Sequence, residues 1–447
     1  MIFSAKAFAE AEGLVCFGDG IISHATFDSR QAVKDSMFIA LRGKTSDGIL
    51  YAESALKNGA SAILTTEDHK ELSSLTALYG AALILSPDPL SSLYSFVKRK
   101  RNSIPGLVTA GITGSCGKTT TKEMLSSILS VKGECVSTPG NLNSEFGLPL
   151  SMLGLTDTCR YSVFECGVDH VGEMDRMAET LHPDIAIVTN ISNSHLESFR
   201  SRDVTAREKG KLVREARVAF VPEKCEYLDY FGTLCPEVYG VKNPFGDINE
   251  HPLTGFDVTL GRERFTIPCI GRAKLEDAAL AVAAARYLGF SDSEIAKGLS
   301  KASALFGRGR IVREGSLSII EDCYNANIRS SIDAINTLSS IVTDAGKHIV
   351  LADMRELGAE SASAHREVAS VLSRADIDDI LLYGREVETT YETLLSLGLK
   401  DKVFYTSDFD SLSREVGKRA RGGDYFLLKG SRVMALERLY PAFREVC

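Results

Sequence analysis

The first hundred residues alternate between short apolar runs and a helical pattern. SMFIALRG (36–43), SAILTT (61–66) and AALILS (81–86) are typical of buried strands, and ILYAESALKNGA (49–60) has the apolar spacing of a helix. The basic run KRKRN (98–102), just before a proline, indicates a solvated linker. The pattern therefore predicts a small α/β domain over residues 1–104.

From residue 106 the pattern changes to longer strand–helix alternation. GLVTAGITG (106–114) is an apolar strand that runs into a glycine-rich turn, and KTTTKEMLSSILSVKG (118–133) has a helical period. YSVFECG (161–167) and DIAIVTNIS (184–192) are further strands, and AKLEDAALAVAAARYLG (273–289) is an alanine-rich helix. Such alternation predicts a parallel sheet covered on both faces, which we assign to residues 105–310.

Four apolar runs in the last third of the chain each end in a polar turn. They are LSIIEDCYNAN (317–327), HIVLADM (348–354), DDILLYG (378–384) and DYFLLKGS (424–431). They predict a second, Rossmann-like α/β domain over residues 311–447. Because open parallel sheets bind ligands at the carboxyl ends of their strands, a binding cleft is expected there. Its candidate residues are Asp322, Asn325, Asn327, Asp353, Glu356, Lys429, Ser431 and Arg432.

Composition narrows the class of protein. The chain has 447 residues, a size that suits two to four domains, and a formal net charge of -8 with no long basic block, so a nucleic-acid partner is not expected. None of its 10 cysteines forms a C-x-x-C pair, which favours free thiols in a reducing compartment. No leader pattern and no apolar stretch of about 18 residues is seen. We expect a cytoplasmic protein without membrane insertion.

The segment GITGSCGKTT (111–120) has the character of a phosphate-binding loop. The usual pattern G-x-x-x-x-G-K-[ST] would put the first glycine at position 112, where an isoleucine stands, and the glycines fall at Gly111 and Gly114 instead. A strand, a glycine turn and a helix start still supply backbone N–H groups for phosphate. Lys118 suits the β- and γ-phosphates and Thr119 suits Mg²⁺. The alternative is an ordinary glycine-rich turn.

Other candidate residues are ambiguous when they are taken singly. Glu165 ends a strand and could meet the Mg²⁺ of the loop, but it could equally be a solvated acid. His195 could bind a metal, although a lone histidine is more often packed or exposed. Lys209 and Lys211 lie on a predicted helix, where lysines are ordinarily exposed. Arg308, in the sequence GRGR, could reach phosphates or belong to a hinge.

Together these motifs resemble the Mur ligases, the ATP-dependent amide-forming enzymes of peptidoglycan synthesis, over essentially the whole chain. Their loop is G-[TS]-x-G-K-[TS], with an earlier glycine where Gly111 stands. FDSRQAVKDSMFIALRGKTSDG (27–48), TPGNLNSEFGLP (138–149), YNAN (324–327) and DMRELG (353–358) look most like the branch that joins D-alanyl-D-alanine to UDP-N-acetylmuramoyl-tripeptide. The D-N-P-R motif of the branch that adds diaminopimelate is absent.

The resemblance implies ATP and two Mg²⁺ ions, with Lys118, Lys209, His195 and Glu165 as the catalytic set. The implied ATP contacts are Gly114, Ser115, Cys116, Gly117, Lys118, Thr119, Thr120, Asn141 and Arg308. The implied metal ligands are Thr119, Glu165, His195 and Lys209, the last as a carbamate. The implied substrate contacts are Ser29, Arg30, Asn143, Asn325, Asn327, Asp353, Glu356 and Lys429. A monomer is the expectation for this family.

The sequence also departs from the family pattern. In GRAKLED (271–277), Ala273, Lys274 and Asp277 stand where the family has His, Asn and Asn, so we expect an altered adenine pocket. Ile328 replaces a proline and Arg200 replaces a glycine. Three rival readings are a Mur-type ligase that adds a single amino acid, a folylpolyglutamate synthetase, and a non-catalytic nucleotide-binding protein.

Overall fold

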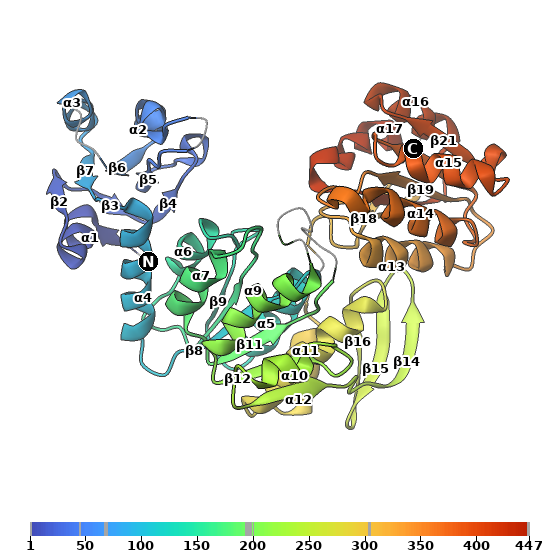
Figure 1. The fold of residues 1–447 in the computed structure, drawn as a ribbon, viewed down its shortest axis with the longest axis horizontal. Helices are drawn as coiled ribbons and strands as arrows, with labels where there is room; N and C mark the ends of the chain where they lie inside the picture. The colour runs from blue at the N-terminus through green and yellow to red at the C-terminus, as the bar shows by residue number, and fades with distance from the viewer. Residues whose placement is uncertain are drawn as a thin grey trace.

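The computed structural model describes residues 2–43, 46–66, 70–192, 199, 201–302 and 305–444. The chain forms three α/β lobes in sequence order, with the N-terminal and C-terminal lobes standing at opposite ends of the central one (Figure 1). Within the described ranges, no helix combines the length and the apolar character that crossing a membrane requires.

The N-terminal lobe is built on a five-stranded sheet with the order β2-β7-β6-β5-β4. Its strands are β2 (Val15–Phe17), β4 (His24–Thr26), β5 (Ser36–Ile39), β6 (Ala60–Thr65) and β7 (Ala82–Leu85), beside a small pair of β1 (Phe3–Ser4) and β3 (Ile21–Ile22). The helices are α1 (Ala5–Glu12), α2 (Ala52–Lys57) and α3 (Lys70–Leu78). The three predicted strands correspond to β5, β6 and β7. Only β2 runs antiparallel within this sheet, to β7.

The prediction of a linker at KRKRN was wrong, because these residues lie in the last turns of helix α4 (Pro89–Ser103). Leu90, Leu93, Tyr94 and Val97 are buried along one stripe of this helix, and that spacing stabilises it by packing. The basic residues at its end suit the negative pole of the helix dipole. Lys98 also pairs with a glutamate of the central lobe at 2.9 Å.

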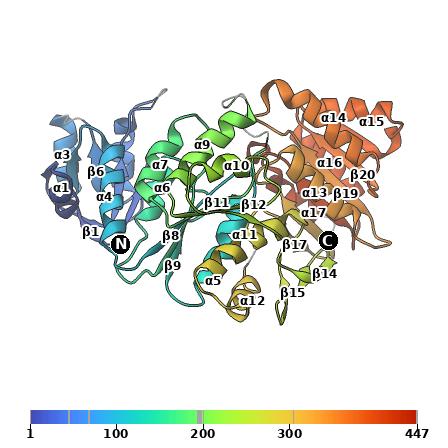
Figure 2. The same ribbon diagram turned by 60° about the horizontal axis from the view of Figure 1, so that its bottom comes forward.

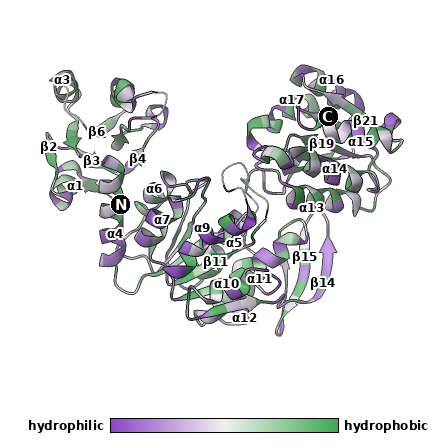
Figure 3. Ribbon diagram, viewed as in Figure 1, coloured by the Kyte–Doolittle hydropathy of each residue, from purple (hydrophilic) through white to green (hydrophobic). Residues whose placement is uncertain are grey.

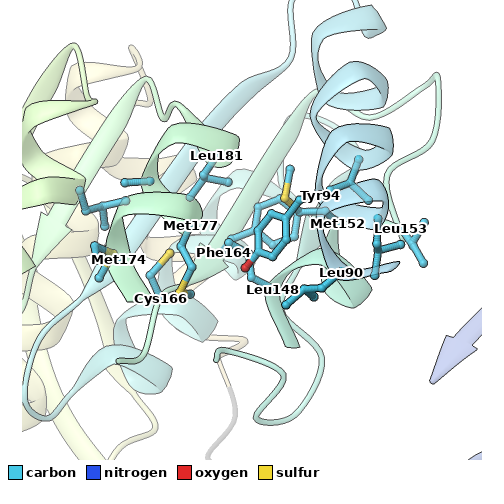
Figure 4. Close-up of a cluster of buried hydrophobic side chains, with 14 of the residues drawn as sticks. Leu90, Tyr94, Leu148, Met152, Leu153, Phe164, Cys166, Met174, Met177 and Leu181 are labelled. Carbon is cyan, nitrogen blue, oxygen red and sulfur yellow. The ribbon is translucent and has the colours of Figure 1, made fainter. Parts of the chain in front are cut away.

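Helix α4 joins the N-terminal lobe to the central lobe through a shared apolar core. Figure 4 shows Tyr94 of α4 beside Leu148 and Met152 of helix α6 (Gly147–Met152), close to Phe164 of the central sheet. The hydroxyl of Tyr94 donates a hydrogen bond of 2.6 Å to the backbone carbonyl of Glu145. The first lobe is therefore packed against the second and not merely tethered to it.

The central lobe has a six-stranded, fully parallel sheet with the order β13-β12-β11-β8-β10-β9, as predicted. The strands are β8 (Val108–Thr113), β9 (Cys135–Ser137), β10 (Tyr161–Glu165), β11 (Ile185–Val188), β12 (Val218–Pro222) and β13 (Val238–Val241). The remaining helices are α5 (Lys118–Leu129), α7 (Glu173–Leu181), α9 (Arg202–Arg214), α10 (Leu228–Gly232), α11 (Ala273–Tyr287) and α12 (Asp292–Leu299). Figure 2 shows α5, α11 and α12 on one face of the sheet and α6, α7 and α9 on the other.

The sequence reading missed an antiparallel sheet of the central lobe. It consists of β14 (Gly246–His251), β15 (Gly255–Leu260) and β16 (Glu263–Ile267). β14 has the polar sequence GDINEH and is coloured as a hydrophilic strand in Figure 3. Because its partners cover little of it, β14 lacks the apolar alternation that marks a half-buried strand.

The C-terminal lobe has a six-stranded sheet with the order β17-β18-β22-β19-β20-β21. The four predicted strands are β18 (Leu317–Asp322), β19 (Lys347–Ala352), β20 (Asp379–Tyr383) and β22 (Tyr425–Lys429). β21 (Val403–Thr406) and the antiparallel edge strand β17 (Arg310–Glu314) were not predicted. The helices are α13 (Ile328–Ser339), α14 (Ser361–Leu372), α15 (Glu388–Ser396), α16 (Phe409–Arg419) and α17 (Tyr440–Arg444). The carboxyl ends of β18 and β22 face the central lobe.

Candidate active site

The loop between β8 and α5 is shaped by two glycines in the left-handed region. Gly114 has φ 146° and Gly117 has φ 83°. A Cβ at Gly114 would lie 1.9 Å from Thr189 Oγ1, so no larger residue fits there. Asn190 anchors the loop, because its backbone carbonyl accepts from the Ser115 N–H at 3.0 Å and its Oδ1 accepts from the next N–H at 3.1 Å. The first N–H groups of α5 have no partner within the helix and can face an anion.

Gly111 has a different role from the loop glycines. It lies inside β8, and a Cβ there would come within 2.9 Å of Leu181 of α7 and 3.1 Å of Leu212 of α9. The glycine therefore lets two helices pack closely on the sheet, while the next residue, Ile112, is buried in the core of the opposite face. The shifted spacing that looked irregular in the sequence reflects this packing.

A hydroxyl and a carboxylate meet directly behind the loop. Thr119 Oγ1 donates to Glu165 Oε2 at 2.9 Å, and Asn143 Nδ2 donates to the other carboxylate oxygen at 2.6 Å. Glu165 is 1% exposed. Lys118 Nζ donates to the carbonyl of Gly114 at 2.8 Å, so its ammonium group lies over the loop.

The oxygen donors of this pair suit Mg²⁺, which prefers oxygen ligands and keeps several waters. Thr119 and Glu165 supply two of them, and phosphate oxygens would complete the shell. Among the residues that the structure describes, no group of three or more His, Cys, Asp or Glu side chains could hold a metal ion. His195, the histidine expected to contribute a ligand, lies outside the described residues.

Lys209 is buried, contrary to what its helix position suggested. Its side chain, on α9, is 1% exposed, and burial together with the nearby charge of Lys118 lowers its pKa to about 7. Lys211 lies two residues further along α9 and stays charged. Its ammonium group pairs with Asp175 and Glu208 at 2.6 Å each, and these pairs raise its pKa.

A cavity of about 280 Å³ connects the phosphate loop with the edge of the C-terminal sheet. Among its lining residues are the predicted Ser115, Cys116, Gly117, Lys118, Thr119, Thr120, Asn143, Glu165, Arg308, Asn325, Asn327 and Lys429. The Arg308 guanidinium lies 4.1 Å from the ring centre of Tyr324, a cation–π contact. Lys429 Nζ donates to Asp322 Oδ2 at 2.6 Å and to the carbonyl of Asn325 at 3.0 Å.

Several predicted residues do not line this cavity. Asp353 is buried and accepts hydrogen bonds from the backbone N–H groups of Arg385 at 3.1 Å and Val387 at 2.9 Å, so it organises the loop after β20. Glu356 has a positive φ of 69° in the neighbouring loop. Gly114, Asn141 and Lys209 are outside its lining, although the charge of Lys118, which lines it, influences Lys209.

The predicted N-terminal pair lies on another lobe. Ser29 and Arg30 belong to the short helix η1 (Ser29–Gln31), and Arg30 is bound by Asp28 at 2.7 Å with its side chain 86% exposed. The structure does not bring this pair to the cavity. A substrate that contacts both would have to extend from the N-terminal lobe to the central one.

The cavity wall also contains four charged residues, of which the sequence had singled out Lys274 and Asp277 as departures at the adenine pocket but had missed Arg329 and Asp333. Burial raises the pKa of Asp277 to about 7. Lys274 Nζ donates to the backbone carbonyl of Arg308 at 2.7 Å, which ties helix α11 to the joint between the lobes. Arg329 and Asp333 lie on helix α13, directly after YNAN, and no motif in the sequence marked them.

Comparisons with known proteins agree with this architecture. Residues 112–285 match the family described as Mur ligase middle domain, and residues 307–432 match the Mur ligase, glutamate ligase domain. A UDP-N-acetylmuramoyl-tripeptide–D-alanyl-D-alanine ligase of Treponema pallidum is 32% identical over 430 residues, covering 94% of this chain and 93% of the relative.

Two solved structures extend the likeness to the whole chain. MurF from Acinetobacter baumannii superposes with a TM-score of 0.86 at 26% identity, covering 100% of this chain and 99% of that one. The MurF ligase of Thermotoga maritima, solved in complex with ADP, has a TM-score of 0.78 at 23% identity, covering 94% and 97%, and shares the fold.

Proposed function

The chain belongs to the Mur ligase family, and we propose that it joins D-alanyl-D-alanine to UDP-N-acetylmuramoyl-tripeptide in an ATP-dependent reaction. The observation that carries the proposal is the cavity in which the phosphate loop and the Thr119–Glu165 pair face Asn325 and Lys429 of the C-terminal lobe. A nucleotide on the loop would thus lie between the lobes. The product would be the UDP-muramoyl-pentapeptide used for peptidoglycan, made in the cytoplasm by a monomeric enzyme.

The phosphate site would hold ATP through complementary charge. The N-terminus of α5 and the Lys118 ammonium group offer N–H donors to the β- and γ-phosphates. Thr119 and Glu165 would hold a Mg²⁺ ion, with Lys209 and His195 as the expected ligands of a second. Bound there, Mg²⁺ would neutralise charge on the phosphoryl group as it transfers. Arg308, held over Tyr324, would approach the nucleotide from the joint between the lobes.

We propose that Lys209 acts as a carbamate. Its neutral amine attacks carbon dioxide, a C–N bond forms, and a proton is released, which turns a cation into a two-oxygen metal ligand. The reaction needs an unprotonated amine, and a lysine pKa near 7 supplies one at neutral pH. Burial also costs less for such an amine than for an ammonium ion.

The reaction proceeds in two displacements. The terminal carboxylate of the tripeptide attacks the γ-phosphorus and ADP leaves, giving an acyl phosphate. The amine of D-alanyl-D-alanine then attacks the acyl carbon, a proton is lost, and the tetrahedral intermediate expels inorganic phosphate to form the amide. Acyl phosphates hydrolyse, so the lobes must exclude water while Asn325, Asn327 and Lys429 orient the incoming dipeptide.

The N-terminal lobe is proposed to bind the UDP-muramoyl end of the substrate through Ser29 and Arg30. The exposed guanidinium of Arg30 suits a diphosphate, and Asn143 at the cavity would meet the peptide end. Asp353 and Glu356 would act by shaping the loops beside the dipeptide.

The test compares the wild type with Lys118→Met. The wild type should convert UDP-muramoyl-tripeptide, D-alanyl-D-alanine and ATP into a pentapeptide of the matching mass. Lys118→Met should lose on the order of a hundredfold or more in turnover, because it removes the positive charge at the transferring phosphoryl group. Unchanged turnover in this variant would contradict the assignment of the loop. A product formed only with a free amino acid would instead favour a related Mur-type ligase.

A further inference from the structure

The carboxylate of Asp277 lies beside the phosphate loop, where its negative charge would repel a bound phosphate. A Cβ built on Gly117 would come within 2.2 Å of Asp277 Oδ1 and 2.9 Å of Oδ2, so the carboxylate occupies the space directly beside this loop glycine. Asp277 is 7% exposed, lies on α11 and lines the same cavity as Lys118. The proposed function brings a nucleotide with several negative charges to this place.

The cations near Asp277 are engaged elsewhere. Lys274 Nζ donates to the carbonyl of Arg308 at 2.7 Å, and the Arg329 guanidinium pairs with Glu276 at 2.5 Å. Neither forms an ion pair with Asp277 within the described part of the chain. The charged or titratable groups that influence or are influenced by Asp277 are Cys116 of the loop, Cys269 before α11, Lys274 and Glu276 on α11, and Arg329 on α13, and the Thr121 hydroxyl of α5 also favours its ionised form. No cation of this set neutralises the carboxylate by direct contact.

We infer that nucleotide binding to the cavity requires Asp277 to carry a proton, so that the protein takes up a proton when it binds ADP or ATP at alkaline pH. The inference rests on the proposed nucleotide site. An ionised Asp277 would repel the phosphates at short range in a site largely removed from water, whereas the neutral acid would not. Asp277 is thus a residue that sets nucleotide affinity without performing a chemical step.

The pKa of Asp277 in the free protein is consistent with binding that requires the protonated acid. Burial raises the pKa of Asp277 to about 7, against the opposing influence of Lys274 and Arg329. At pH 8 about one molecule in eleven then holds the proton, so the apparent affinity for nucleotide should be about tenfold weaker than at pH 6. Binding should cause proton uptake and not release, because a bound phosphate raises the pKa of a neighbouring carboxyl further, and the carboxyl then takes a proton from solution.

The experiment is calorimetric titration of ADP with excess MgCl₂ into the full-length protein at pH 8, in Hepes and in Tris. These buffers differ in ionisation enthalpy, so the dependence of the observed heat on that enthalpy gives the number of protons taken up. The wild type should take up about 0.9 proton per ADP, which is the fraction of Asp277 ionised at this pH. Asp277→Asn should take up none, and its affinity should be unchanged between pH 6 and pH 8.

Asp292→Asn is the control, because it removes an acid that pairs with Arg286 at the far end of α11 and lies outside the cavity lining. It should keep the proton uptake of the wild type. Binding of ADP by the wild type without proton uptake would overturn this inference and leave the nucleotide site intact. Uptake that persists in Asp277→Asn would overturn it too, by assigning the proton to another group. Absence of any ADP binding to the wild type would contradict the nucleotide site itself, and this inference with it.

Discussion

Replacing Lys209 is the perturbation that most sharply separates a carbamate from an ordinary buried lysine. Lys209→Met keeps the length and the apolar stem of the side chain but removes the nitrogen that would react with carbon dioxide. If the carbamate holds a metal ion at the site of phosphoryl transfer, turnover should fall on the order of a hundredfold. If the amine is only a packed group, the variant should be as active as the wild type, since methionine fills a buried space well.

The magnitude of the reactivity follows from the pKa. With a pKa of about 7, about three quarters of Lys209 is unprotonated at pH 7.5, whereas a lysine of ordinary pKa has about one neutral amine in a thousand. Lys209 should therefore present several hundred times more reactive amine than a surface lysine. Because the pKa of Lys209 is lowered to about 7, the neutral fraction of its amine rises as the pH increases through 7. Carbamate occupancy should rise over the same interval.

The assay combines activity with carbon-13 NMR. Protein stripped of carbon dioxide should lose activity and regain it with ¹³C-bicarbonate, and a carbamate resonance should appear in parallel. Lys211→Met is the control, because Lys211 is on the same helix but is held as a cation by Asp175 and Glu208. That variant should keep both the resonance and the activity. A wild type that shows no carbamate resonance and no response to bicarbonate would refute the carbamate at Lys209.

Three further predictions follow from individual contacts. Glu165→Gln should raise the Mg²⁺ concentration for half-maximal turnover about tenfold or more, because it removes one charged oxygen ligand, and an unchanged Mg²⁺ titration would place the metal elsewhere. His348→Ala should destabilise the C-terminal lobe by about 3 kcal/mol in thermal unfolding, because Asp379 and Asp424, now 2.8 and 3.1 Å from its ring nitrogens, would lose their shared partner. Tyr94→Phe should cost about 1 kcal/mol of unfolding free energy, and an equal stability would mean that its 2.6 Å hydrogen bond is replaced by water.

The sequence could predict the central and C-terminal sheets because their strands are buried on both faces. Runs such as IAIV of β11 and IVLA of β19 are continuous in apolar residues, and the parallel order follows from strand–helix alternation. Two of the strands that escaped prediction, β14 and β17, lie at the edges of sheets, where one side is exposed to solvent and the apolar alternation is weak. The helix at KRKRN was not predicted because these five residues are all polar, and the buried stripe of α4 that begins at Leu90 ends before them.

The phosphate loop was predictable because its chemistry is local, since Lys118 and Thr119 follow directly on two loop glycines. The state of Lys209 was not, because its burial depends on helices that meet only in the folded chain. Asp277 is similar, since its contact with Gly117 joins segments 160 residues apart, the difference between their numbers. Contacts between such distant segments form only in the folded chain. The family resemblance gave the residue types at these positions but not their surroundings.

The most direct test of the central claim is the acceptor dependence of phosphate release. Purified protein would receive ATP, Mg²⁺ and UDP-N-acetylmuramoyl-tripeptide, with D-alanyl-D-alanine, with single amino acids, or with no acceptor. We expect phosphate release that requires both the tripeptide and the dipeptide and equals the amount of pentapeptide formed. Release of phosphate without an acceptor, or tight ATP binding with no turnover under any condition, would contradict it.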